Sequence, residues 1–156
     1  MIIVSEQEIL SKWLSDRIGY EPNPGLQCIG NASSDGKILA VTGYDSWNGA
    51  CCNIHIAGEG NNWLSRAFLH IMFDYPFNRE NVKVLIGKIS SQNKKSIKFA
   101  KHIGFEEVGV IENGAIDGNL VIMQLQRENC RFLDKKYNHE IRIAPSDFLK
   151  NTSRNA

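Results

Sequence analysis

Apolar residues recur at intervals of three and four near the start of the chain, as they do along one face of an α-helix. These residues are Ile9, Leu10, Trp13, Leu14 and Ile18. Ser5 and Glu8 have the spacing of a capping box, in which two side chains satisfy the first backbone N–H groups of a helix. Gly19 follows the last apolar position. The pattern therefore predicts a helix over residues 6–18.

Shorter apolar runs separated by turn residues predict three strands after this helix. They cover residues 26–32, 37–47 and 50–58. Ser34-Asp35-Gly36 and Asn48-Gly49 lie between the runs, and tight turns of this kind join antiparallel neighbours. We therefore expect a three-stranded meander.

The second half of the chain alternates helical and strand patterns. One helical face ends near Pro76 and is formed by Trp63, Leu64, Ala67, Phe68, Ile71 and Met72. An apolar run over 82–89 has no polar face, which is typical of a central buried strand. Residues 94–102 predict a short amphipathic helix with its lysines outside, and residues 105–114 and 119–129 predict a closing pair of strands. This order of elements indicates the α/β (α+β) class.

Composition and charge restrict the function. The chain has 156 residues, is 42% hydrophobic, and carries 18 basic against 17 acidic residues. One compact domain is expected, and a net charge of +1 gives no broad field for nucleic acid or a membrane surface. The chain contains no apolar run of about 18 residues, and acidic residues follow the N-terminus too soon for a secretory signal. We expect a cytoplasmic protein.

The four cysteines have no spacing typical of a metal site. They are Cys28, Cys51, Cys52 and Cys130. Adjacent residues of a strand point to opposite faces, so Cys51 and Cys52 do not point the same way. We expect free, mostly buried thiols in a reducing compartment and no metal ion.

The most specific pattern is the polar corner that follows the buried strand. Ile89 lies four residues before Asn93, Ser96 lies three residues after it, and Gly104-Phe105 ends the segment. With the order of helices and strands, this corner resembles the GNAT family of acetyl-coenzyme A (acetyl-CoA) dependent N-acetyltransferases over residues 3–126.

This resemblance implies a fold and a domain division. The expected GNAT-like fold has a mixed, mostly antiparallel sheet of about seven strands flanked by helices. Its fourth and fifth strands splay apart around the pantetheine arm of acetyl-CoA. Residues 1–128 would form the acetyltransferase domain, and residues 129–156 a partly packed extension whose last six residues are disordered. Tyr75-Pro76-Phe77 resembles a triplet of the branch that acetylates ribosomal proteins and other protein N-termini.

The resemblance also implies cofactor contacts. The positions are Ile54, Ile56, Ala57, Gly60, Asn61, Asn62, Trp63, Leu64, Ser65, Arg66, Asn93 and Ser96. In the expected pyrophosphate loop, Gly60, Trp63 and Ser65 depart from the family's Arg/Gln-x-x-Gly-x-Gly/Ala. Such a loop holds phosphates mainly through backbone N–H groups at a helix N-terminus, so a side-chain change alone does not abolish binding. Trp63 either lies over the cofactor or anchors its helix in the core.

Acetyl transfer to an amine requires a base, and strand alternation selects a candidate. His55 shares a face with Cys51 and Asn53, and an imidazole titrates near neutral pH. His55 is therefore our candidate general base, with Glu59 as the alternative and a structural histidine as the competing interpretation. The tyrosine that donates a proton in many family members falls on Ala100 here, so the general acid is unassigned, with Ser90, Ser91 or a water as substitutes.

The resulting hypothesis is an N-acetyltransferase that moves the acetyl group of acetyl-CoA to a primary amine. The amine belongs to a protein N-terminus, a lysine or a small molecule, and Asp45 and Glu112 are candidates for attracting it. The alternative is a catalytically inactive GNAT-like module that binds or inhibits a protein partner. Either would be a monomer or a homodimer.

Overall fold

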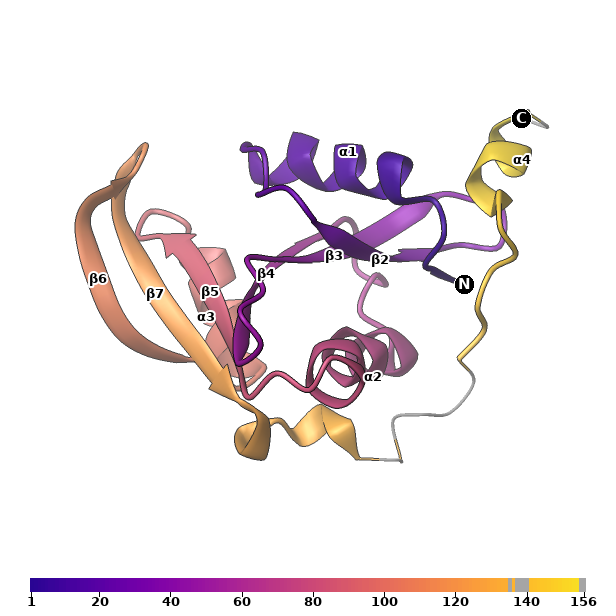
Figure 1. Ribbon diagram of the computed structural model, residues 1–156. Helices are drawn as coiled ribbons and strands as arrows, with labels where there is room; N and C mark the ends of the chain where they lie inside the picture. The colour runs from indigo at the N-terminus through magenta and orange to yellow at the C-terminus, as the bar shows by residue number, and fades with distance from the viewer. Residues whose placement is uncertain (135, 137–140, 155–156) are drawn as a thin grey trace.

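A seven-stranded sheet with helices on both faces forms the protein, as the computed structural model shows for residues 1–134, 136 and 141–154 (Figure 1). The strand order is β1-β2-β3-β4-β5-β7-β6. The strands are β1 (Ile2–Ile3), β2 (Gln27–Ala32), β3 (Ile38–Asp45), β4 (Cys51–Gly58), β5 (Val84–Ser90), β6 (Glu106–Ala115) and β7 (Gly118–Gln126). The helices are α1 (Gln7–Ile18), α2 (Arg66–Asp74), α3 (Lys94–His102) and α4 (Phe148–Arg154). The predicted fold class is confirmed.

Six strand pairs form the sheet, and five of them are antiparallel. The exception is β4 with β5, which pair in parallel only from Cys51–Val84 to Asn53–Ile86. Beyond Asn53, β4 stays paired with β3, and beyond Ile86, β5 stays paired with β7. The sheet therefore divides at this point into two halves that separate, which is the splay expected between the fourth and fifth strands.

Two hydrophobic clusters lie on the two faces of the sheet. Helix α1 covers one face of β2–β4 through Leu10 and Leu14, which pack with Cys28 and Val41. Helix α2 lies on the opposite face (Figure 1), and its Phe68 belongs to the larger cluster that also includes residues of β5, β7 and α3. The predicted inward face of the lysine-rich helix is confirmed by Ala100, which is buried, while the lysines of α3 are exposed.

The capping box predicted at Ser5 and Glu8 is wrong. Helix α1 begins at Gln7 after Glu6, and its start, within the described ranges, shows no side-chain capping bond. The carboxylate of the buried Glu6 instead accepts hydrogen bonds from the backbone N–H groups of Leu149 and Lys150 at 2.9 and 3.0 Å. Glu6, the N-cap residue of α1, thus uses its side chain for a contact 143 residues away along the chain.

The predicted second helix begins later than its apolar pattern. Trp63 and Leu64 lie in the loop before α2, because Ser65 is the N-cap and accepts a hydrogen bond from the N–H of Phe68 at 3.1 Å. As predicted, the α-helix ends next to Pro76, after which a π-helical turn, η1 (Tyr75–Arg79), carries the chain toward β5.

The segment after β7 packs against the domain. It contains two short 3₁₀ helices, η2 (Arg127–Asn129) and η3 (Arg131–Leu133), and a parallel bridge between Ile143 and Ile2. Helix α4 continues to Arg154, and the disorder of the last six residues stays a prediction. Residues 155–156 lie outside the described part. Across the described ranges, no helix combines the length and apolar character that a membrane span needs.

Candidate active site

The edge of β4 beyond Asn53 faces the opening between the two halves of the sheet. Its residues 54–58 keep their hydrogen bonds to β3, from Ile54–Tyr44 to Gly58–Ala40, while their pairing with β5 has ended. Backbone groups on the β5 side of this edge are thus released from the sheet. His55 is the second residue of the released edge.

His55 is hydrogen-bonded through both ring nitrogens. Its Nε2 lies 3.0 Å from Oδ2 of Asp45, on the neighbouring strand β3. Its Nδ1 lies 2.7 Å from the hydroxyl of Tyr20, in the segment that follows α1. The side chains of His55 and Asp45 are 9% and 1% exposed, whereas Tyr20 is 46% exposed. The three residues form a chain of hydrogen bonds from the interior to the surface.

The donors and acceptors in this series of hydrogen bonds determine which atoms carry a proton. Oδ2 of Asp45 also accepts a hydrogen bond from the backbone N–H of Asn23 at 2.9 Å. A carboxylate only accepts, so Nε2 of His55 is the nitrogen that carries the proton and donates it to Asp45. In neutral imidazole the other nitrogen is then an acceptor, and the Tyr20 hydroxyl donates to Nδ1.

The other oxygen of Asp45, Oδ1, is buried and has no hydrogen-bond partner among the described residues. A buried carboxylate that is incompletely satisfied is stabilised by a positive charge nearby. The ring of His55 lies beside this carboxylate, with Nε2 3.0 Å from the other oxygen, Oδ2.

Tyr20 was not singled out by sequence analysis. Burial raises the pKa of its hydroxyl above the usual value, and the negative charge of Asp45 raises this pKa further. The hydroxyl therefore keeps its proton at neutral pH. Only its position directly after Gly19, where α1 ends, distinguishes Tyr20 in the sequence, and that position gives no hint of His55, 35 residues away.

The alternative base, Glu59, follows the end of β4 and forms an ion pair with Arg17 of α1 at 2.8 Å. Arg17 also lies over the ring of Trp13, 3.6 Å from its centroid. Glu59 thus joins the end of β4 to α1. The other carboxylate predicted to attract an amine, Glu112, is exposed on β6.

The predicted substitutes for the general acid lie at the end of β5. Ser90 donates a hydrogen bond to Asp117 at 2.5 Å, and Ser91 accepts one from the N–H of Asn119 at 3.0 Å. The Ser90 hydroxyl therefore connects β5 to the turn between β6 and β7, and the Ser91 hydroxyl connects the residue after β5 to the start of β7. Ala100, at the family's tyrosine position, is buried in the core.

The start of α3 carries two of the predicted cofactor positions. Asn93 is the N-cap, and its Oδ1 accepts a hydrogen bond from the N–H of Ser96 at 3.2 Å. Asn93 is exposed and Ser96 is half-buried. This arrangement closes the corner between β5 and α3 and leaves the amide nitrogen of Asn93 at the surface.

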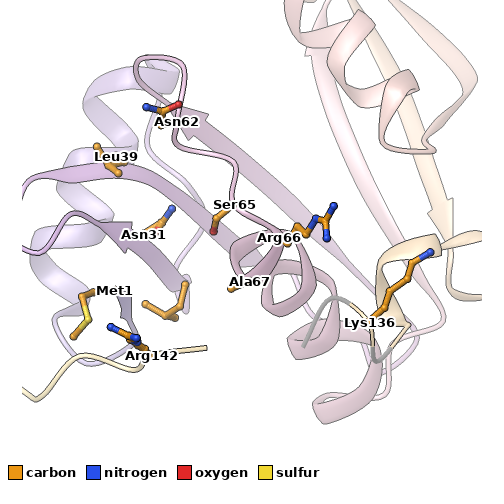
Figure 2. Close-up of a pocket in the computed structure, with 10 residues that line it drawn as sticks. Met1, Asn31, Leu39, Asn62, Ser65, Arg66, Ala67, Lys136 and Arg142 are labelled. Atoms are coloured by element: carbon orange, nitrogen blue, oxygen red, sulfur yellow. The ribbon is translucent and has the colours of Figure 1, made fainter. Parts of the chain in front are cut away.

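A positively charged cavity of about 590 Å³ lies at the N-terminus of α2. Figure 2 shows Ser65, Arg66 and Ala67 at the start of the helix, with Met1 and Arg142 across the cavity. The positive end of the helix dipole, the amino group of Met1 and the side chains of Arg66 and Arg142 favour binding of an anion here. Asn62 of the predicted phosphate loop also lines the cavity.

Trp63 connects the end of β4 to α3. Its ring lies over Gly58, so close that a Cβ on Gly58 would lie 2.3 Å from a ring atom. The ring also contacts Phe99 of α3, with centroids 5.4 Å apart, and the backbone oxygen accepts a hydrogen bond from Asn31 at 2.9 Å. Trp63 packs against the larger core cluster, as one of its two predicted roles requires.

These features fit coenzyme A. The released edge of β4 offers backbone groups for an amide-containing arm, and the N-terminus of α2 with Arg66 offers donors and positive charge for phosphates. Trp63, one of the three departures from the family's loop pattern, places its ring between the end of β4 and α3.

The fold is shared with structures of known acetyltransferases. Spermidine N-acetyltransferase from Vibrio cholerae in complex with CoA and spermine is 11% identical, with a TM-score of 0.68 over 86% of this chain and 98% of that one. N-acetyltransferase PseH of Campylobacter jejuni is 13% identical, with a TM-score of 0.54 over 67% of this chain and 70% of that one. At these identities the similarity establishes the fold alone.

Comparison with curated protein sequences gives no match. A family model does match, over residues 3–122, and its description is acetyltransferase (GNAT) domain. This range contains β4, the released edge, and the corner at Asn93. The chain therefore belongs to the GNAT family of acetyltransferases and is an N-acetyltransferase that uses acetyl-CoA.

Proposed function

We propose that this enzyme acetylates a primary amine with His55 as general base, oriented by Asp45. The observation that carries the proposal is the 3.0 Å contact between Nε2 of His55 and Oδ2 of the buried Asp45, on the edge of β4 that the splay releases. Acetyl-CoA, when bound, supplies the acetyl group as a reactive thioester. The chain's own residues bind this molecule, orient the base and take up the proton of the amine.

The buried carboxylate has two effects on His55. It fixes the tautomer with the proton on Nε2, so Nδ1 is the nitrogen that accepts a proton. It also stabilises the imidazolium that forms when the amine is deprotonated, because the opposite charge lies close by in a poorly solvated place. Glu59, which is paired with Arg17, is the weaker candidate for the base.

In this proposal, three parts of the chain contact the cofactor. Ile54, Ile56 and Ala57 present the released backbone edge to the pantetheine arm. The loop from Gly60 through Asn61 to Leu64, followed by Ser65 and Arg66, holds the phosphates with the N-terminus of α2. Asn93 and Ser96 contact the arm from the start of α3.

The acceptor in this proposal is a cationic amine. The hairpin of β6 and β7 carries Glu106, Glu107, Glu112 and Asp117, and the sequence has no basic residue between Phe105 and Gln126. A polyamine, the substrate named for the V. cholerae enzyme, is one such amine. A protein N-terminus, indicated by Tyr75-Pro76-Phe77, is the other. An assay of polyamines and of peptides with free N-termini distinguishes the two sources.

The test compares His55→Gln with His102→Gln, since His102 is exposed in the last turn of α3. Release of CoA is measured with each amine, and binding of acetyl-CoA is measured by calorimetry. We expect His55→Gln to lower kcat by about 100-fold or more with acetyl-CoA binding retained, and His102→Gln to leave both unchanged. Full activity of His55→Gln would remove it as the base. Absence of CoA binding and of turnover in the unaltered protein would support the inactive binding module instead.

A further inference from the structure

The acceptor nitrogen of His55 is covered by Tyr20. The Tyr20 hydroxyl lies 2.7 Å from Nδ1, and the two rings meet edge to face with their centroids 5.6 Å apart. The other nitrogen is committed to Asp45. As the described residues lie, a proton from outside would reach Nδ1 of His55 through the oxygen of Tyr20, or after Tyr20 has moved away.

Tyr20 is placed to exchange protons with a bound molecule. Tyr20 is 46% exposed, whereas the side chains of His55 and Asp45 are 9% and 1% exposed, so Tyr20 is the outermost residue of this series of hydrogen bonds. A phenol hydroxyl donates one hydrogen bond while its oxygen accepts another. Because the donated bond goes to Nδ1, the lone pairs on the oxygen remain for an amine.

We propose that Tyr20 is a catalytic residue that relays the proton of the acceptor amine to His55. The N–H bond of the amine breaks as an O–H bond forms on Tyr20. The original O–H bond of Tyr20 breaks as an N–H bond forms on Nδ1, which leaves an imidazolium beside the Asp45 carboxylate. The reverse transfer through Tyr20 then returns the proton to solvent. This inference rests on the proposed role of His55 as the base.

The surroundings of the relay support this direction. Among the described residues, Tyr20 from the segment after α1 and Asp45 from β3 are hydrogen-bonded to the two ring nitrogens of His55, and Arg17 of α1 is paired with Glu59. The raised pKa of Tyr20 keeps its hydroxyl protonated at neutral pH, as a relay requires. Asn23 donates from its backbone to Asp45 and from its side chain to Ser46, and so holds the adjoining loop in place.

Tyr20 also gives the site a hydroxyl that can carry a proton, although the tyrosine found in many family members is missing here. Ala100 has no hydroxyl group, the Ser90 hydroxyl donates to Asp117 in the turn between β6 and β7, and the Ser91 hydroxyl accepts from the N–H of Asn119 on β7. Tyr20 lies on a different element from the family's position. The alternative role for Tyr20 is a cover that shields Nδ1 and leaves before reaction.

The kinetic test uses Tyr20→Phe, His55→Gln and the double variant. A relay predicts that Tyr20→Phe lowers kcat by about 10- to 100-fold without changing acetyl-CoA binding, and that the double variant is no slower than His55→Gln alone, because both act in one chain of proton transfer. Unchanged or faster turnover of Tyr20→Phe would overturn the relay and favour the cover. Full activity of His55→Gln would reject His55 as the base. This outcome differs from one in which His55→Gln is slow and Tyr20→Phe is not, which rejects the relay alone.

A second measurement does not depend on turnover. Long-range ¹H–¹⁵N NMR of the imidazole reports which ring nitrogen is protonated, and folding of each variant is checked in the same spectra. We expect the unaltered protein to show the Nε2–H tautomer and Tyr20→Phe to shift the Nδ1 resonance as the hydrogen bond is lost. A proton on Nδ1 in the unaltered protein, or an Nδ1 resonance that Tyr20→Phe leaves in place, would overturn the proposed direction of transfer.

Discussion

The indole ring of Trp63 lies directly over the backbone of Gly58, the last residue of β4. A Cβ on Gly58 would fall 2.3, 2.5 and 2.7 Å from three ring atoms, closer than real Cβ atoms approach other groups. The ring cannot simply withdraw, because it also contacts Phe99 and its backbone is held by Asn31. Glycine at position 58 is thus a consequence of tryptophan at position 63.

Gly58→Ala should therefore destabilise the protein. The added methyl group forces the Trp63 ring away from the end of β4, and overpacking of this kind costs about 1–3 kcal/mol of unfolding free energy. Gly109→Ala on β6 is the matched control, since no atom lies within 4 Å of a Cβ there. Urea unfolding of both variants checks the prediction, and equal midpoints would show that the ring moves freely.

Binding of acetyl-CoA should change the fluorescence of Trp63. The ring lies between the end of β4 and α3, which are on the two sides of the opening assigned to the cofactor arm. Of the three tryptophans, Trp13 lies on α1 under Arg17, and Trp47 packs against Tyr44 and Tyr75. We expect a titration with acetyl-CoA to shift the emission of the unaltered protein and not that of Trp63→Phe. The same shift in Trp63→Phe would place the cofactor away from this ring.

Asp45→Asn should reduce activity without reducing stability. The amide of Asn keeps one oxygen for the hydrogen bonds from Asn23 and His55 and replaces Oδ1, which has no partner among the described residues, so we expect a small effect on unfolding. The variant removes the group that orients and stabilises protonated His55, and we expect kcat to fall by about 100-fold. Asp16→Asn, on the exposed side of α1, is the control for both measurements. A loss of stability with full activity would identify the His55–Asp45 contact as purely structural.

The sequence predicted those features that depend on residues close together in the chain. Strand alternation placed His55 on a polar face, and the pattern from Ile89 to Asn93 located the corner that caps α3. Contacts between distant residues were not predictable from such patterns. Tyr20 reaches His55 only because α1 crosses β4, and Glu6 caps α4 from the other end of the chain. Strand β1 has two residues, too few for a period to appear.

Glu6→Gln should loosen α4. The carboxylate accepts from two N–H groups of the first turn of α4, whereas an amide offers one oxygen and turns an NH₂ group toward the other N–H. We expect faster hydrogen exchange at Leu149 and Lys150 and a loss of about 1 kcal/mol in the free energy of unfolding. Glu8→Gln, exposed in the first turn of α1, is the matched control. Unchanged exchange at both amides would show that α4 is held by its apolar contacts alone.

Stability should fall as the pH rises above about 9, because three thiols are buried in their neutral form. Burial raises the pKa of Cys28 and of Cys52 to about 12, and that of Cys130 to about 11, from a usual value of 9.0. At a pH between 9.0 and these raised pKa values, the thiols of the unfolded chain lose their protons while those of the folded chain keep them. The folded state then binds more protons, so the free energy of unfolding decreases with rising pH.

Urea midpoints at pH 8 and pH 10 measure this effect, with Cys52→Ala as the comparison. The decrease should be smaller in Cys52→Ala, because one of the three buried thiols is then absent from both states. Labelling at pH 8 gives an independent check: thiolate is the reactive form, so half-buried Cys51 should react with iodoacetamide before the three buried thiols. Equal labelling of all four in the folded protein, with no alkaline loss of stability, would show that water reaches the three buried thiols.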